Sequence, residues 1–161
     1  MIGIMFVCHG NICRSPMAEF VLKDMVKKQG IKDKFFIASS ATSTEEIDNP
    51  VHRGTGDKLS KFSISTDGKY AVQFTKLDYQ KYDYIIGMDE YNIRNILRII
   101  GQDPENKVTK LFDFSDTLGD IADPWYTGNF DETYDDIKVG CEALLKYISH
   151  KASCKNASSL I

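Results

Sequence analysis

The segment from residue 2 to residue 22 most constrains the fold, because only a short loop separates a buried strand from a helix. Residues 2–7 form an apolar run typical of a buried strand. A helix is expected from Pro16, with Ser15 as its N-cap and Pro16 at the first helical position, where a missing N–H costs nothing. A loop between such elements aims backbone N–H groups and the positive end of a helix dipole at one spot. The segment therefore predicts an anion-binding loop.

The loop itself carries a thiol at one end and a guanidinium at the other. Cys8 opens it and Arg14 closes it, with five residues between them. The N–H groups and the guanidinium favour the thiolate form of Cys8, and the planar Arg14 fork matches two phosphate oxygens. Gly10 and Asn11 are the residues that most easily adopt positive φ, which a loop curled around an oxyanion needs. We therefore expect a nucleophile inside a phosphate cradle; the alternative is an inert buried cysteine beside a surface arginine. The predicted phosphate-binding residues are His9, Gly10, Asn11, Ile12, Cys13, Arg14 and Ser15.

The motif from Val7 to Glu19 resembles the active-site loop of the low-molecular-weight protein tyrosine phosphatases. Its inner Asn11, its second cysteine Cys13 and the ending Ser15-Pro16 all match that loop. The resemblance extends over about residues 2–146. It implies hydrolysis of phosphotyrosine proteins and small aryl phosphates through a cysteinyl-phosphate intermediate. Inorganic phosphate would then be both product and inhibitor.

Strand and helix patterns alternate along the rest of the chain. After a helix over 16–29, strands are expected at 35–39, 82–88 and 108–112, and helices at 57–62, 89–100 and beyond Asn129. This alternation implies an α/β fold: a single-domain, three-layer, Rossmann-like architecture with a central four-stranded parallel sheet flanked by helices. Residues 1–150 are expected to form the phosphatase domain, and the polar residues 151–161 a frayed tail.

Length and charge exclude several other classes of protein. A chain of 161 residues suggests one domain, and the net charge of −3 gives no basic surplus for a nucleic-acid partner. No apolar run is long enough to span a bilayer. The first apolar run is short and lacks a basic lead, so it indicates a strand and not a signal peptide. We therefore expect a cytoplasmic protein, mainly monomeric, with weak self-association left open.

The acid is expected in the long loop at 113–129. A phenolate is a poor leaving group without a proton, because tyrosine has a pKa of about 10, and a placed acid contributes about 10²–10⁴-fold. Asp123, which stands before a proline and two aromatic residues, is the candidate, and this arrangement also resembles the acid loop of the family. Ligands of parallel sheets bind beyond the carboxyl ends of strands, so this loop and the Cys8 loop can reach one edge. The other acids of the loop, interpreted as solvated charges, are Asp113, Asp116 and Asp120.

Pocket residues and departures from the family bear on substrate choice. Trp125 and Tyr126 are expected to wall an aromatic slot, although aromatic residues more often serve a core or an interface. Glu45 stands where family members often carry an aromatic residue, which either weakens one wall or selects basic substrates. His9 replaces a commonly apolar loop residue. In the family the tyrosines of this loop are sometimes phosphorylated, which makes Tyr126 a regulatory candidate.

Supporting roles are implied by the resemblance. Asn11 and Ser15 would brace the loop, with Ser15 donating to the thiolate, and Ser39 would hydrogen-bond to Asn11. Asp89 matches an acid near the family site, although a plain helix-start acid is an equal interpretation. Lys69 stands where the family often has a histidine that supports the loop.

Cysteine usage suggests a redox role and leaves an alternative activity open. In the family, a second loop cysteine, here Cys13, protects the nucleophile by a transient disulfide with Cys8. No zinc-ligand pattern occurs, and neither a metal nor a cofactor is expected, because Arg14 and the loop N–H groups supply the charge. The alternatives are an arsenate reductase, for which Cys141 and Cys154 are poorly placed as a thiol relay, and a non-catalytic phosphate-binding module.

Overall fold

The computed structural model describes residues 1–159 and contains one parallel sheet with the strand order β2-β1-β3-β4. Its strands are β1 (Ile2–Cys8), β2 (Phe35–Ala41), β3 (Tyr84–Gly87) and β4 (Val108–Lys110). The helices are α1 (Arg14–Lys28), α2 (Arg53–Ser60), α3 (Lys76–Lys81), α4 (Glu90–Ile100), α5 (Pro124–Thr127) and α6 (Phe130–Ser158), with short 3₁₀ helices η1 (Lys32–Lys34) and η2 (Leu111–Phe114). The predicted α/β class with a four-stranded parallel sheet is confirmed.

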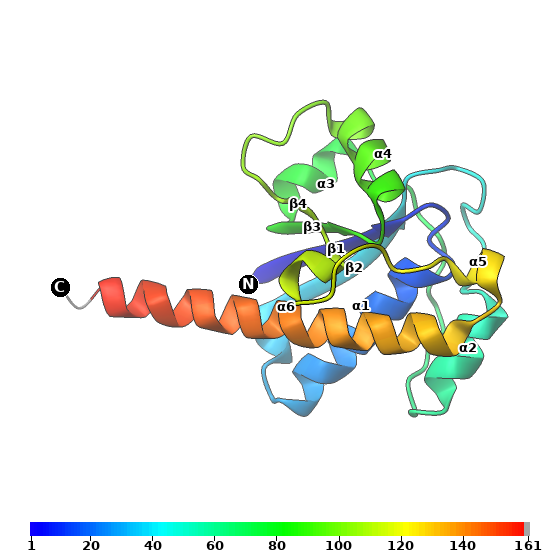
Figure 1. Ribbon diagram of the computed structural model, residues 1–161, viewed down its shortest axis with the longest axis horizontal. Coiled ribbons are helices and arrows are strands. Elements are labelled where there is room, and N and C mark those ends of the chain that lie inside the picture. The colour runs from blue at the N-terminus through cyan, green and yellow to red at the C-terminus, as the bar shows by residue number, and fades with distance from the viewer. Residues whose placement is uncertain (160–161) are drawn as a thin grey trace.

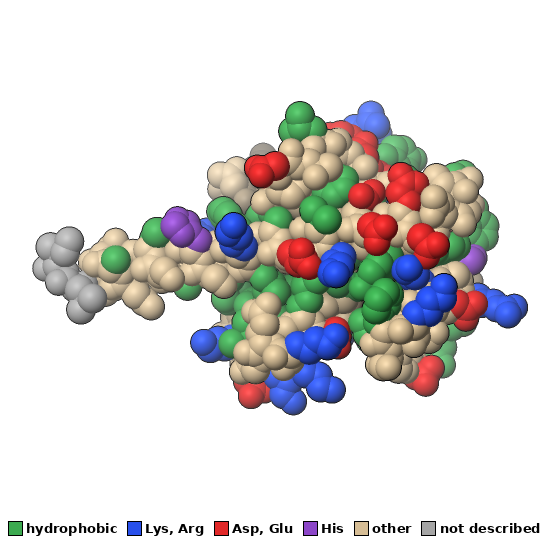
Figure 2. All heavy atoms as spheres, turned by 60° about the horizontal axis from the view of Figure 1, so that its bottom comes forward, with side chains coloured by type: hydrophobic (Ala, Val, Ile, Leu, Met, Phe, Trp, Pro, Cys, Tyr) green, Lys and Arg blue, Asp and Glu red, His purple; other side chains and the backbone are tan. Residues whose placement is uncertain are grey.

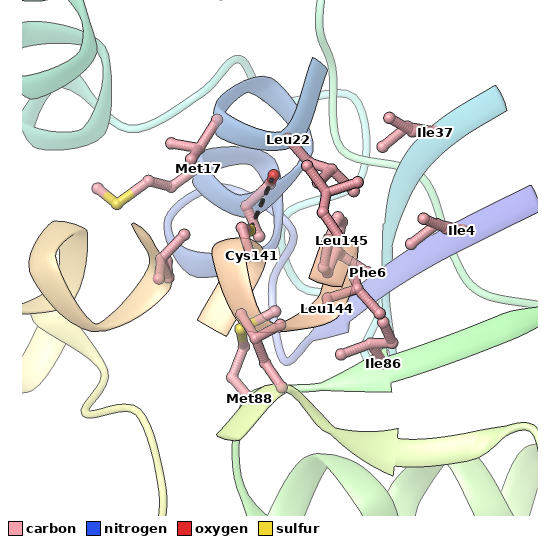
Figure 3. Close-up of a cluster of buried hydrophobic side chains, with 14 of the residues drawn as sticks. Ile4, Phe6, Met17, Leu22, Ile37, Ile86, Met88, Cys141, Leu144 and Leu145 are labelled. Carbon is pink, nitrogen blue, oxygen red and sulfur yellow. Dashed lines mark hydrogen bonds between the residues drawn. The ribbon is translucent and has the colours of Figure 1, made fainter. Parts of the chain in front are cut away.

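Helices cover both faces of the sheet, as Figure 1 shows, with α1 and α6 below the strands and α3 and α4 above them. Alternate residues of β1 supply the two cores: Ile4 and Phe6 pack with α1 and α6, whereas Met5 and Val7 pack toward α3 and α4. Figure 3 shows the first of these cores, in which the Cys141 thiol of α6 donates to the Ala18 carbonyl of α1. The strands are therefore buried on both sides, which explains their continuous apolar runs.

The strand register brings three loops to one edge of the sheet. Cys8 pairs with Ala41 of β2, and Val7 pairs with Gly87 of β3. Since all four strands run in the same direction, the segments after β1, β2 and β3 leave from the same end. In Figure 1 this end lies on the right, with α5 beside it, and the described end of α6 lies on the left.

Two element boundaries differ from the sequence prediction at the site. Helix α1 begins at Arg14 and not at Pro16, and its N-cap Cys13 makes no side-chain cap bond. The reason is that the Ser15 hydroxyl contacts Cys8 and Asn11 instead of capping the helix. Strand β4 ends at Lys110, two residues early, because the Asp113 carboxylate accepts from the Lys110 amide and closes a 3₁₀ turn.

Two further helices depart from the prediction. Helix α2 begins at Arg53, four residues before the predicted start, because the His52 ring nitrogen accepts from the Gly54 amide and caps it. Helix α3 was not predicted; it begins after Thr75, whose amide donates to the Asp78 carboxylate in a capping box.

Helix α6 continues to Ser158, into the segment from residue 151 for which a frayed tail was predicted. Its lysine and alanine residues favour a helix, and the Ser153 hydroxyl donates to the Ser149 carbonyl one turn earlier. Figure 2 shows it as an arm projecting from the body of the molecule. Residues 160 and 161, also predicted to fray, lie outside the described residues. In the part of the chain from 1 to 159, no helix is both long and apolar enough to cross a membrane.

Close packing of α6 on η2 predicts opposite effects for two glycine substitutions. A Cβ on buried Gly140 would lie 2.9 Å from Leu111 Cδ2 and closer still to its Cγ, whereas a Cβ on Gly56 of α2 would have only ordinary contacts. We expect Gly140→Ala to destabilise the fold by about 1–3 kcal/mol through overpacking. Gly56→Ala should stabilise it by up to about 1 kcal/mol, because alanine favours helices. Urea unfolding measures both; a stabilised Gly140→Ala variant would contradict the packing described.

Candidate active site

The Cys8 side chain lies at the end of β1, buried beneath the loop that follows it. Its Sγ lies 3.0 Å from Ser15 Oγ, and the Ser15 backbone N–H donates to it at 3.4 Å. Asn11 has the expected positive φ, 58°, but Gly10 does not. Space around Gly10 is tight instead, since a Cβ there would lie 3.3 Å from Cγ of Glu46 and would displace that side chain by a few tenths of an ångström.

Asn11 ties the loop to two neighbouring segments. Its Nδ2 donates to Ser15 Oγ at 2.8 Å and to Ser39 Oγ at 2.9 Å, so the contact expected between Asn11 and Ser39 is present. Its Oδ1 accepts from the Val72 amide at 3.1 Å. Because the Asn11 amide is fully buried and bonded at both ends, it holds the loop in one conformation.

A buried ion pair lies behind Ser39. The Ser39 hydroxyl donates to Glu19 Oε2 at 2.5 Å, and Lys69 Nζ donates to the Ser39 carbonyl at 2.8 Å. Lys69 Nζ also lies 3.6 Å from Glu19 Oε2, while Lys23 pairs with Oε1 of the same carboxylate. Burial lowers the pKa of Lys69, and the attraction of Glu19 opposes this shift. Lysine thus occupies the supporting position expected from the sequence.

Glu19 was missed by the sequence analysis, although a signal was present. It stands four residues after Ser15, and residues four apart share one face of a helix. Ser15, Glu19 and Lys23 follow at this spacing and form a polar row along a helix that begins at the phosphate-binding loop. This spacing is the signal in the sequence that could have indicated Glu19 as a neighbour of the loop.

Arg14 connects the loop to two distant segments. Its Nη1 donates to Asp89 Oδ2 at 2.6 Å and to the Ile121 carbonyl at 2.9 Å, and Nη2 donates to Asp123 Oδ2 at 3.3 Å. The side chain is only 3% exposed. Burial disfavours the charged guanidinium, but attraction from Cys8, Asp89 and Asp123 outweighs it and raises the pKa of Arg14. The guanidinium therefore remains a full positive charge beside the Cys8 thiol.

The structure separates Asp123 from the other acids of its loop. Asp123 is the N-cap of α5, where Oδ1 accepts from the Trp125 amide at 3.0 Å. Asp113 and Asp120 bond instead to the Lys110 amide and ammonium, and Asp116 borders a different surface hollow. Asp123 alone among these four acids lines the pocket over Cys8.

The pocket over Cys8 brings together most of the predicted site residues. Trp125 and Tyr126 are 58% and 84% exposed, and the His52 ring, which the sequence analysis did not single out, contacts Trp125 edge-on at 5.7 Å. Asn11, Ser15, Ser39 and Asp89 do not line the pocket. Ser15 contacts Cys8 and Asp89 accepts from Arg14, whereas Asn11 bonds to Ser15 and Ser39 bonds to Asn11, one step further from the pocket. Within residues 1–159, no group of three or more His, Cys, Asp or Glu side chains is arranged to hold a metal ion. The lining residues are Cys8, His9, Gly10, Ile12, Cys13, Arg14, Glu45, Glu46, Asp123, Trp125 and Tyr126.

The site combines a thiol and an arginine in one anion-binding loop with a facing carboxylate, at the edge of a parallel α/β sheet. This combination is typical of enzymes that use a cysteine to act on a bound phosphate group. The family model described as low molecular weight phosphotyrosine protein phosphatase matches residues 3–154, and the chain belongs to this family. It is 42% identical to the low molecular weight protein-tyrosine-phosphatase YfkJ of Bacillus subtilis, over 92% of this chain and 96% of that protein. The PtpA phosphatase of Staphylococcus aureus is 37% identical over 96% of this chain and 99% of its own.

Solved structures agree with this assignment. The crystal structure of YfkJ from Bacillus subtilis superposes with a TM-score of 0.90, covering 94% of this chain and 96% of that one. The low molecular weight protein tyrosine phosphatase SP-PTP from Streptococcus pyogenes, 39% identical, has a TM-score of 0.82 over 93% of this chain and 99% of its own. The resemblance expected from the loop motif therefore holds over nearly the whole fold.

Cys13 of the loop and Cys154 of α6 are predicted to differ in their reactivity with an alkylating agent. Burial, together with the negative charges of Cys8 and Asp123, raises the pKa of Cys13 to about 12. Cys13 is then protonated at pH 8 and should stay unlabelled by iodoacetamide in the native protein, whereas exposed Cys154 is labelled. Peptide mapping by mass spectrometry measures this, and unfolded protein, labelled at both positions, is the control. Equal native labelling of Cys13 and Cys154 would contradict the burial described.

Proposed function

We propose that this protein hydrolyses phosphotyrosine in proteins, and small aryl phosphates, with Cys8 as the nucleophile and Asp123 as the general acid and base. The observation that carries the proposal is the Arg14 side chain, which lines the same pocket as Cys8 and donates to Asp123 at 3.3 Å. The proposed nucleophile, the guanidinium and the proposed acid thus line one pocket that opens to solvent. Membership of the family supports the same assignment.

In the first step the Cys8 thiolate attacks phosphorus and forms an S–P bond. The bond from phosphorus to the phenolic oxygen breaks, and Asp123 gives its proton to that oxygen. The Arg14 fork and the loop N–H groups bind the equatorial phosphoryl oxygens, whose charge they neutralise. The substrate dianion competes for Arg14 with Asp123, which releases that carboxyl for proton transfer.

In the second step water attacks phosphorus and the S–P bond breaks. Asp123, now a carboxylate, accepts the proton of the water, and inorganic phosphate leaves. The Ser15 hydroxyl accepts from Asn11, so its own proton is directed to the Cys8 sulfur, which it stabilises as the leaving thiolate. Released phosphate fits the same cradle and acts as an inhibitor.

Trp125 and Tyr126 are proposed to wall the phenyl ring, with His9 and Glu45 at the rim. An aromatic wall of this kind favours the phenyl ring of phosphotyrosine over the shorter serine and threonine phosphates. The proposed substrates are phosphotyrosine proteins, and the protein is proposed to act as a monomer in the cytoplasm, where four free thiols stay reduced.

Hydrolysis of p-nitrophenyl phosphate in EDTA tests the nucleophile and the acid together. We expect turnover in wild type, none in Cys8→Ser, and a kcat about 10²–10⁴-fold lower in Asp123→Ala. Asp116→Ala, a change in the same loop at an exposed acid, is the matched control and should keep its activity. A folded but inactive wild type would contradict the proposal, and thiol-coupled arsenate reduction would be the next assay.

A second proposal concerns Cys13 as the resolving thiol. Mild peroxide oxidises Cys8 to a sulfenic acid; the Cys13 sulfur then displaces hydroxide from it, forming a disulfide and water. We expect mass spectrometry to find a Cys8–Cys13 disulfide that dithiothreitol reverses with recovery of activity. Cys13→Ser, the control, should instead progress to an irreversible sulfinic acid at Cys8. Sulfinate without a disulfide in wild type would count against the proposal.

A further inference from the structure

The rim of the pocket is closed on one side by a contact between two loops. His9, which follows β1, and Glu45, which follows β2, meet with Nε2 and Oε2 3.0 Å apart. Their side chains are 38% and 70% exposed, so the contact lies at the mouth and not at the base. A carboxylate at this point is thus already placed to accept an N–H donor beside whatever enters the pocket.

A second carboxylate makes up the wall next to this contact. Glu46 also lines the pocket, and its Oε2 is held by Asn49 Nδ2 at 2.6 Å. Its Cγ would lie 3.3 Å from a Cβ on Gly10, which places the side chain against the phosphate loop. The orientation of this wall is therefore set by bonds within the protein.

The positive charge of the pocket lies at a different depth. Among the described residues that line it, Arg14 is the one lysine or arginine, and it lies buried at the base with Asp89 and Asp123. Arg94 contacts the Tyr91 ring, which neighbours His9, but it does not line the pocket. The base thus attracts the phosphate dianion, while the mouth presents carboxylate oxygens to the residues beside it.

From this separation we infer that Glu45, supported by Glu46, is a specificity-determining residue that selects phosphotyrosine flanked by lysine or arginine. The inference rests on the proposed function and adds a substrate class to it. A flanking ammonium or guanidinium replaces His9 as the donor to Glu45, and a flanking acid is repelled by both carboxylates. Because the contact is exposed, its effect is moderate and weakens with salt.

The test compares three phosphotyrosine peptides that differ only in having lysine, alanine or glutamate on both sides of the phosphotyrosine. We expect wild-type kcat/KM to fall in that order, with about a tenfold span from lysine to glutamate at low salt. Glu45→Gln should reduce the span about threefold, and Glu45→Gln with Glu46→Gln should nearly abolish it. The measured quantity is a ratio within one variant, so a uniform change in activity cancels.

Glu142→Gln is the matched control, because it removes the same charge from an exposed position of α6 that does not line this pocket. It should leave the span unchanged. Equal kcat/KM for the three peptides in wild type, or a span that survives the double variant, would overturn the inference while p-nitrophenyl phosphate is still hydrolysed. Loss of all hydrolysis, of the aryl phosphate included, would overturn the proposed function and the inference together.

Discussion

The buried charge of Arg14 is the constraint on which the site depends. A guanidinium removed from water is costly unless it is paired and hydrogen-bonded, and Arg14 has three acceptors from two distant segments. Asp89 begins α4, whereas Ile121 and Asp123 lie in the loop before α6. The hydrogen bonds and ion pairs of this one side chain therefore fix where two loops lie relative to the phosphate-binding loop.

The opposite side of the loop is held by a second buried network. Asn11 bonds to Ser15 and Ser39, and Ser39 bonds to the buried pair of Glu19 and Lys69. The conformation around Cys8 is thus determined by side chains that never reach the pocket. A loop organised in this way presents its N–H groups without reorganisation when charge develops, which is the general source of electrostatic catalysis.

The sequence predicted the strands, the sheet and the two chemical loops, since each depends on local patterns: apolar runs, a spaced Cys8 and Arg14, and Asp123 before a proline. Its errors arose where side chains form contacts that the chain order does not reveal. Ser15 was predicted to cap α1, but it bonds to Cys8 and Asn11, which shifted the start of the helix. Long-range partners such as the Ile121 carbonyl carry no signal in the sequence at all.

Gly10 shows the same limit at a single residue. Its type predicted a positive φ, which the structure does not show; what the structure shows is a close approach, because Glu46 from the segment after β2 lies against it. Glu46 itself has no feature in the sequence that marks it as a pocket residue. The rim of the pocket is formed by contacts between loops, and these loops come together only when the strands are paired in register.

The most direct test of the central claim is chemical identification of the phosphorylated residue. Wild-type protein would be mixed with p-nitrophenyl phosphate, quenched with acid within its first turnovers, digested and mapped by mass spectrometry. The proposed mechanism predicts a phosphoryl group on the peptide that contains Cys8, bonded to sulfur. Phosphate on another residue, or steady turnover with no phosphorylated enzyme at any quench time, would contradict it.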